Sequence, residues 1–130
     1  MSLTSDDRNA IQDLLARYCW HFDEGEGDAW ADLWTTDGEF TGIPDPARGR
    51  EALRQLPGGF HGMFAGRMRH QIVNIAADPG PAGDQADVRA YSLLSDWREA
   101  GKLFAFAKLA LRLRRVSGTW KIQTLHAEMF

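Results

Sequence analysis

The hydrophobic pattern of this chain changes its period once, near Met68, and that change constrains the fold more than any other feature. Before Met68, apolar side chains recur every three or four residues, which is the period of an amphipathic helix. After it, apolar and polar residues alternate in runs at about 68–77, 85–97, 102–116 and 119–129, separated by hairpin-sized gaps. Helices followed by an antiparallel meander predict an α+β fold whose curved sheet folds over the helices.

The N-terminal segment predicts a helical hairpin. Residues 1–22 carry a single apolar stripe, which predicts a helix, and Thr4 or Ser5 can cap the start of that helix. The acidic, glycine-containing segment that follows ends this helix. Asp28 then caps a short second helix whose apolar stripe reaches Trp34.

The segment before the change of period predicts one strand and a third helix. Residues 37–38 are a turn signal, and residues 39–43 predict a short strand. The third helix begins near Gly49, and Pro57 with the two glycines after it is expected to break it. Residues 60–66 would then form a loop or a bent turn that could act as a lid.

The composition is that of one globular domain spanning residues 1–130, with 44% hydrophobic and 25% charged residues. The net charge of −3 argues against nucleic-acid binding, and no apolar run is long enough for a membrane span. The single cysteine, Cys19, cannot form an intramolecular disulfide, and no signal segment opens the chain. We therefore expect a cytoplasmic protein.

The run 102–116 predicts a strand with two unequal faces. One face is apolar and includes Leu111, which suits a core or a pocket wall. The other mixes Phe104, Phe106 and Lys108 with further cations, which is unusual for a solvated face. We expect this outer face to form a homodimer interface.

Tyr18, Asp23 and His70 are the residues best suited to proton transfer. Asp23 follows the C-terminal end of a helix, where the helix dipole gives a carboxylate no support, so another group should hold it. His70 alternates onto one strand face with apolar neighbours and is expected to point inward, where an imidazole can serve as a base beside a carboxylate. Tyr18 lies in the apolar helix stripe, and its hydroxyl can stabilise developing negative charge. Locally, a solvated acid, a core histidine and a core tyrosine remain open alternatives.

Weaker candidates share these predicted faces. Asn74 falls on the face of His70, and His126 falls on the face of Trp120 and Ile122 in the last strand. No spacing of histidines, cysteines or acids matches a zinc or calcium site, and no phosphate loop, dinucleotide fingerprint or serine-nucleophile motif is present. We therefore expect neither a metal nor a cofactor.

The chain resembles the SnoaL-like branch of the nuclear transport factor 2-like superfamily over nearly its whole length. Together with Asp23, the carriers of the resemblance are IQDLLARY (11–18), DAWADLW (28–34), TDGEF (36–40), GREAL (49–53), RHQIVN (69–74) and GTWKI (118–122). This resemblance implies a cone-shaped fold with an apolar cavity inside a strongly curved sheet, and a dimer through the outer sheet face.

The resemblance also implies a reaction. Dehydratase members use an Asp-His dyad, whose positions Asp23 and His70 match, and Tyr18 resembles their assisting tyrosine. The leading hypothesis is a cofactor-independent lyase, a dehydratase acting on a small apolar or cyclic hydroxy-carbonyl substrate. An isomerase or polyketide cyclase using the same base, and a non-catalytic binding module, remain alternatives. The expected substrate-binding set is Asn74, Trp30, Phe64, Ser92, Leu111 and His126.

Overall fold

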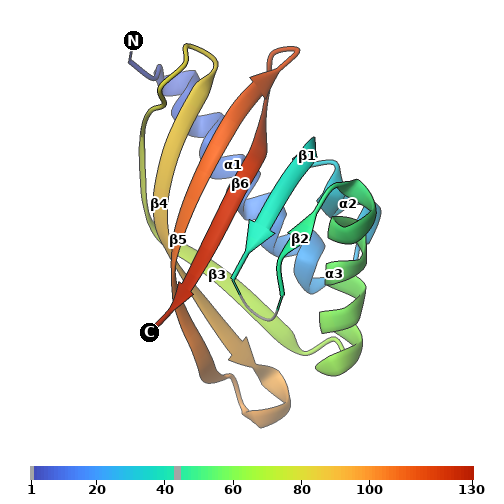
Figure 1. Cartoon of the computed structure of the whole chain (residues 1–130). Coiled ribbons are helices and arrows are strands. Elements are labelled where there is room, and N and C mark those ends of the chain that lie inside the picture. The colour runs from blue at the N-terminus through green and yellow to red at the C-terminus, as the bar shows by residue number, and fades with distance from the viewer. Residues whose placement is uncertain (1, 43–44) are drawn as a thin grey trace.

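The computed structural model describes residues 2–42 and 45–130 and has two layers, three helices against one six-stranded sheet (Figure 1). The elements in chain order are α1 (Ser5–Asp23), α2 (Gly27–Ala31), β1 (Trp34–Thr41), β2 (Ala47–Arg48), α3 (Arg50–Met63), β3 (Met68–Pro79), β4 (Gln85–Asp96), the 3-10 turn η1 (Trp97–Glu99), β5 (Lys102–Val116) and β6 (Thr119–Met129). The strand order is β2-β1-β6-β5-β4-β3. The predicted α+β class and the four-stranded meander are confirmed.

Helix α1 begins where its sequence predicts. Thr4 and Asp7 form a reciprocal capping box, in which the side chain of each accepts from the backbone N–H of the other. The apolar stripe, including Ile11 and Leu15, is buried against the sheet. Figure 1 shows α1 running behind the long strands, with α2 and α3 beyond β1 and β2. The stripe therefore fixes which face of α1 the rest of the molecule covers.

The second helix is shorter than predicted, because Trp34 opens β1 instead of extending the helix. β1 pairs in parallel with β6, and its register shifts between Trp34 and Glu39. The expected turn at Asp37 and Gly38 is thus absorbed inside the strand, where a Cβ on Gly38 would lie 2.9 Å from the Trp34 ring. The predicted end of this strand at Ile43 lies outside the described residues.

Helix α3 continues through Pro57, so the predicted break is wrong. Pro57 cannot donate a helical hydrogen bond, which costs about 3 kcal/mol in an exposed helix. Here the proline is fully buried, and Leu53 on the same helix is also buried. Burial of this apolar face offsets the lost bond, and residues 60–63 belong to the helix rather than to a loop.

Bulges interrupt the alternation of three further strands. The register shifts between Val73 and Ala76 in β3, at Phe104 in β5 against β4, and at Gln123 in β6. Each extra residue moves the following side chains to the opposite face of the sheet. In the described part of the chain, no helix is long and apolar enough to cross a membrane.

Candidate functional site

Asp23 and His70 are in direct contact. Asp23 is the last residue of α1 and His70 the third residue of β3. The Asp23 carboxylate accepts from the His70 backbone N–H through Oδ2 at 2.8 Å, and its Oδ1 lies 2.6 Å from His70 Nδ1. Both side chains are less than one tenth exposed. The two contacts supply the support that the helix dipole denies a carboxylate at this end of α1.

This geometry fixes the direction in which His70 can act. An ionised carboxylate only accepts hydrogen bonds, so the proton on the imidazole lies on Nδ1, facing Asp23. Nε2 then carries the free lone pair. The imidazole also borders the cavity described next, so the pair can orient a neutral base and stabilise the imidazolium formed when it takes a proton.

An apolar cavity of about 260 Å³ lies beside His70. Tyr18, Ser92 and His70 supply the polar side chains of its wall. Ser92 is buried and stands opposite Ile72 in the β3–β4 register, two residues along β3 from His70. The rest of the wall is apolar and comprises Phe22, Phe40, Leu56, Phe60, Leu94, Phe104, Ala105, Ala107, Leu109, Ala127 and Met129. Such a wall suits a compact neutral molecule with few polar groups.

Tyr18 is buried against the same wall. The edge of its ring meets the His70 ring with 6.1 Å between centroids, and Trp30 supports it from another side at 5.4 Å. Burial raises the pKa of the Tyr18 phenol far above its usual value, and the nearby Cys19 and Asp23 raise it further. The phenol therefore remains protonated and can donate a hydrogen bond to a bound molecule.

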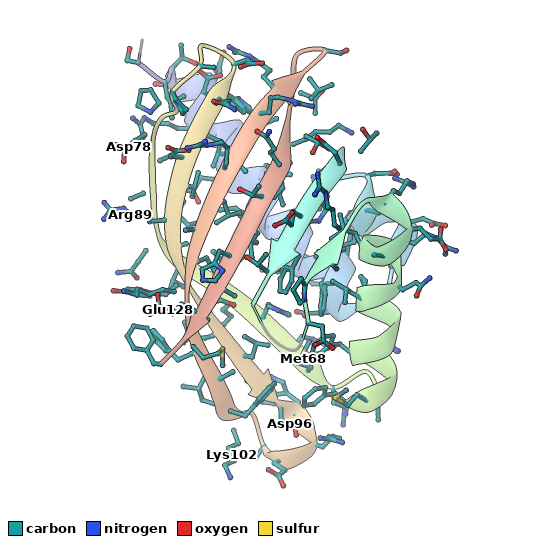
Figure 2. The ribbon with its side chains drawn as sticks, in the orientation of Figure 1. Met68, Asp78, Arg89, Asp96, Lys102 and Glu128 are labelled. Carbon is teal, nitrogen blue, oxygen red and sulfur yellow. The ribbon has the colours of Figure 1, made fainter. Side chains whose placement is uncertain are left out.

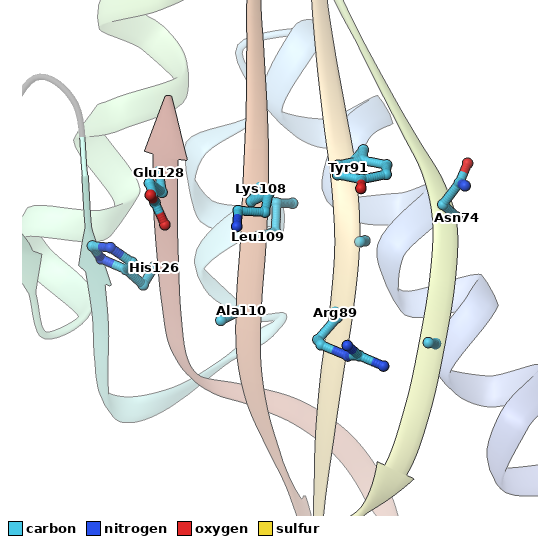
Figure 3. Close-up of a pocket in the computed structure, with 10 residues that line it drawn as sticks. Asn74, Arg89, Tyr91, Lys108, Leu109, Ala110, His126 and Glu128 are labelled. Atoms are coloured by element: carbon cyan, nitrogen blue, oxygen red, sulfur yellow. The ribbon is translucent and has the colours of Figure 1, made fainter. Parts of the chain in front are cut away.

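Asn74 and His126 do not line this cavity. They border a separate hollow of about 440 Å³ on the outer face of the sheet, together with Tyr91, Lys108 and Glu128 (Figure 3). The expectation that they share the inner faces of their strands is wrong, and the bulges are the reason. Asn74 occupies the β3 bulge with φ 56°, and the β6 bulge turns His126 outward, where its Nδ1 lies 2.8 Å from a hydroxyl of β1.

Of the other predicted binding residues, Ser92 lines the cavity, whereas Trp30, Phe64 and Leu111 lie outside its wall. Trp30 and Leu111 are buried in the core, and Phe64 stacks on Phe104 at 5.0 Å between ring centroids. Phe104 itself was expected on the outer face, but as the bulge residue of β5 it lines the cavity.

Phe22 is a wall residue that the sequence interpretation did not single out. Its ring meets the His70 ring edge-on at 5.0 Å. Its position in the sequence, one helical turn after Tyr18 on the apolar stripe of the first helix, could have identified it.

Neither a metal site nor a reactive thiol accompanies the Asp23–His70 pair in the described part of the chain. Among the residues described by the structure, no group of three or more histidine, cysteine or acidic side chains could hold a metal ion. Burial raises the pKa of the Cys19 thiol to about 12, with a further contribution from Asp23, so this thiol is a poor nucleophile. The arrangement is suited to proton transfer.

Comparison with known proteins agrees with this architecture. A family model described as a SnoaL-like domain matches residues 4–126. No curated protein matches the chain.

Three solved structures illustrate the likeness. A nuclear transport factor 2-like protein with a cystatin-like fold from Novosphingobium aromaticivorans is 24% identical, with a TM-score of 0.86 over 96% of this chain and 82% of that one. A protein from the same organism, provisionally described as a scytalone dehydratase, is 21% identical, with a TM-score of 0.80 over 95% and 84%. A protein from Catenulispora acidiphila in complex with S-DNPA is 26% identical, with a TM-score of 0.83 over 97% and 95%. The first two identities establish a shared fold alone.

Proposed function

Since this chain belongs to the SnoaL-like family, we propose that it is a cofactor-independent lyase, a dehydratase acting on a small apolar or cyclic hydroxy-carbonyl compound. The observation that carries the proposal is the hydrogen-bonded pair of Asp23 and His70 beside an apolar cavity. The likeness in fold to the protein provisionally described as a scytalone dehydratase is consistent with it.

The proposed reaction consists of proton transfers. Nε2 of His70 takes a proton from the carbon next to the substrate carbonyl, and the electron pair of that C–H bond forms the new C=C bond as the C–O bond to the hydroxyl breaks. The imidazolium returns its proton to the departing hydroxide, which leaves as water. Asp23 holds the imidazolium, and Tyr18 donates a hydrogen bond to the carbonyl oxygen. Each positioned group contributes roughly 10²- to 10⁴-fold to the rate.

A screen of hydroxy-ketones against the wild type and His70→Ala tests this assignment. We expect the wild type to release water from one or more of them and the variant to lose at least about 10²-fold of that activity. Equal activity in the two proteins would remove His70 as the base. Product mass separates the related reactions, because a lyase product lacks one water whereas an isomerase or cyclase product that rearranges the same bonds keeps the substrate mass.

A binding-only module is the second candidate, favoured by one observation. The described cavity wall contains no acidic or cationic side chain, so His70 alone would have to protonate a leaving group. Tight binding of a hydroxy-ketone with no turnover by the wild type would support this candidate instead.

We also propose a homodimer through the outer sheet face. Phe106, Tyr91 and Phe130 form an aromatic cluster there, and the Phe130 ring, which lies under the Lys108 ammonium, is 77% exposed. Tyr91 and Phe106 are partly exposed, and a partly exposed aromatic cluster is typical of an interface. Mass measured in solution tests it, and a strict monomer would contradict it.

A further inference from the structure

A third hollow, at the edge strand β3, is also lined by the Asp23–His70 pair. It has a volume of about 510 Å³ and is bounded by the last turn of α1, the first residues of β3 and the end of β4 with η1. We call it the outer groove. It lies at the end of the β3–β4 pair, which Met68 and Asp96 mark in Figure 2. Its volume is in the range of small-molecule sites.

Two tryptophans lie in this groove with their rings largely in solvent. Trp20 is 69% exposed and Trp97 is 53% exposed, whereas the three other tryptophans are buried. Trp97 is held in place, because its Nε1–H donates to Ser95 Oγ at 3.1 Å. Its ring also lies so close to Gly101 that a Cβ there would come within 2.8 Å of it. The groove therefore presents a fixed aromatic surface that the fold does not cover.

The groove also presents two arginines. Arg69 is anchored, since its Nη1 donates to the carbonyl oxygens of Gly66 at 3.0 Å and Met68 at 2.7 Å. Its remaining charge is partly balanced by Glu24, whose Oε1 lies 3.7 Å from Nη2. Arg67 is exposed and makes no ion pair with a carboxylate of the described residues.

Neither acid of the groove pairs with Arg67. Both carboxylate oxygens of Asp23 are occupied by His70, and Glu24 is paired with Arg69. Arg67 is thus the guanidinium of the groove that is left available to a ligand. A guanidinium beside an exposed indole matches a planar ring that carries a carboxylate, because the ring can stack on the indole while the guanidinium binds both oxygens.

We propose that the outer groove is a second ligand site, which binds planar aromatic carboxylates between Trp20 and Trp97 with Arg67 as the anion contact. This site is distinct from the apolar cavity, whose wall offers no cation. Its occupation requires no turnover, so the proposal stands or falls independently of the role of His70 as a base.

The test is a titration with 2-naphthoate, and with 2-naphthamide as its neutral analogue, followed by ¹⁵N NMR of the tryptophan side chains. Trp20→Phe and Trp97→Phe assign the two groove signals. We expect naphthoate to shift the Trp20 and Trp97 signals and to bind about tenfold more tightly than the amide, as a charge-assisted hydrogen bond at an exposed site provides.

Arg67→Gln should weaken naphthoate binding about tenfold and leave the amide unaffected. Arg48→Gln is the matched control, because Arg48 is also an exposed arginine but lies on β2 and does not line the outer groove, and the affinity of this variant for naphthoate should equal that of the wild type. Shifts confined to Trp30 and Trp34, whose rings pack on the cavity-wall residues Tyr18 and Phe40, would place the ligand in the cavity and overturn the proposal. Equal affinity for acid and amide, or an unchanged affinity in Arg67→Gln, would also overturn it.

Discussion

Replacing Asp23 by Asn should move the proton of the neutral His70 imidazole from Nδ1 to Nε2. The carboxylate accepts two hydrogen bonds from His70, one from the backbone N–H and one from Nδ1. The Asn amide has one acceptor oxygen and one NH₂ donor. If its oxygen keeps the backbone N–H, its NH₂ faces Nδ1, which must then lose its proton. The proton moves to Nε2, and the cavity loses its base.

The size of the effect follows from the same contacts. Loss of a charge-assisted hydrogen bond at a buried pair costs about 1.5–3 kcal/mol of unfolding free energy. Removal of a negative charge from the C-terminal end of α1 raises the unfolding free energy by about 0.3–1 kcal/mol, because the helix dipole disfavours an acid there. The first contribution is larger, so we expect Asp23→Asn to be destabilised by about 1–2 kcal/mol. Any proton-transfer activity should fall about 10²- to 10⁴-fold.

Two measurements check this prediction. Long-range ¹H–¹⁵N NMR at about pH 9, where an ordinary imidazole is neutral, reports which nitrogen of His70 carries the proton. Urea unfolding reports the stability. Asp78→Asn is the control, because Asp78 is an exposed aspartate on the same strand and its replacement should change stability by no more than about 0.5 kcal/mol. A protonated Nδ1 retained in Asp23→Asn, with unchanged stability, would refute the reasoning.

Three further predictions concern separate parts of the molecule. Tyr18→Phe should lower the activity of the proposed site by about 10²- to 10³-fold in kcat with little change in KM, and an unchanged kcat would exclude its hydroxyl from the reaction. Hydrogen bonds from the Thr4 backbone and the Trp120 indole lower the pKa of Asp7 below 3.8. The stability that these hydrogen bonds provide is therefore complete above pH 3.8 and is lost as the pH falls through the folded-state pKa of Asp7. Between pH 5 and pH 2 the melting temperature should consequently fall less steeply in Asp7→Asn than in the wild type. Gly101→Ala should cost about 1–2 kcal/mol in urea unfolding because φ is 79° there, and wild-type stability would show that this backbone relaxes.

The order and type of the main elements could be predicted because each is encoded locally. The change of period at Met68 separates the helices from the meander, and the strand limits 102–116 match β5. The continuation of α3 through Pro57 could not be predicted, because it depends on burial against elements far away in the sequence. The extension of β1 to Trp34 likewise depends on its pairing with β6.

The site residues divide along the same line. The contact between Asp23 and His70 joins a helix end to a strand, and the resemblance to a family indicated it where local patterns left it open. Asn74, His126 and Phe104 were assigned to the wrong faces because a bulge leaves almost no local signal and yet inverts every later position. Errors of this kind affect the residues of the cavity wall more than those of the hydrophobic core, because the wall residues lie next to the irregular parts of the strands.

The bulges make the cavity wall tolerant of residues lost from the strands. Because a bulge adds one residue between two stretches of regular alternation, deletion of that residue leaves the side chains on either side of it on the same faces of the sheet. Deleting Gln123 from β6 would place Thr124 directly after Ile122, so His126 would stay on the outer face while Ala127 and Met129 would still line the cavity. The bulge residues are therefore the positions at which a strand of this scaffold can lose a residue without a change in the composition of the cavity wall.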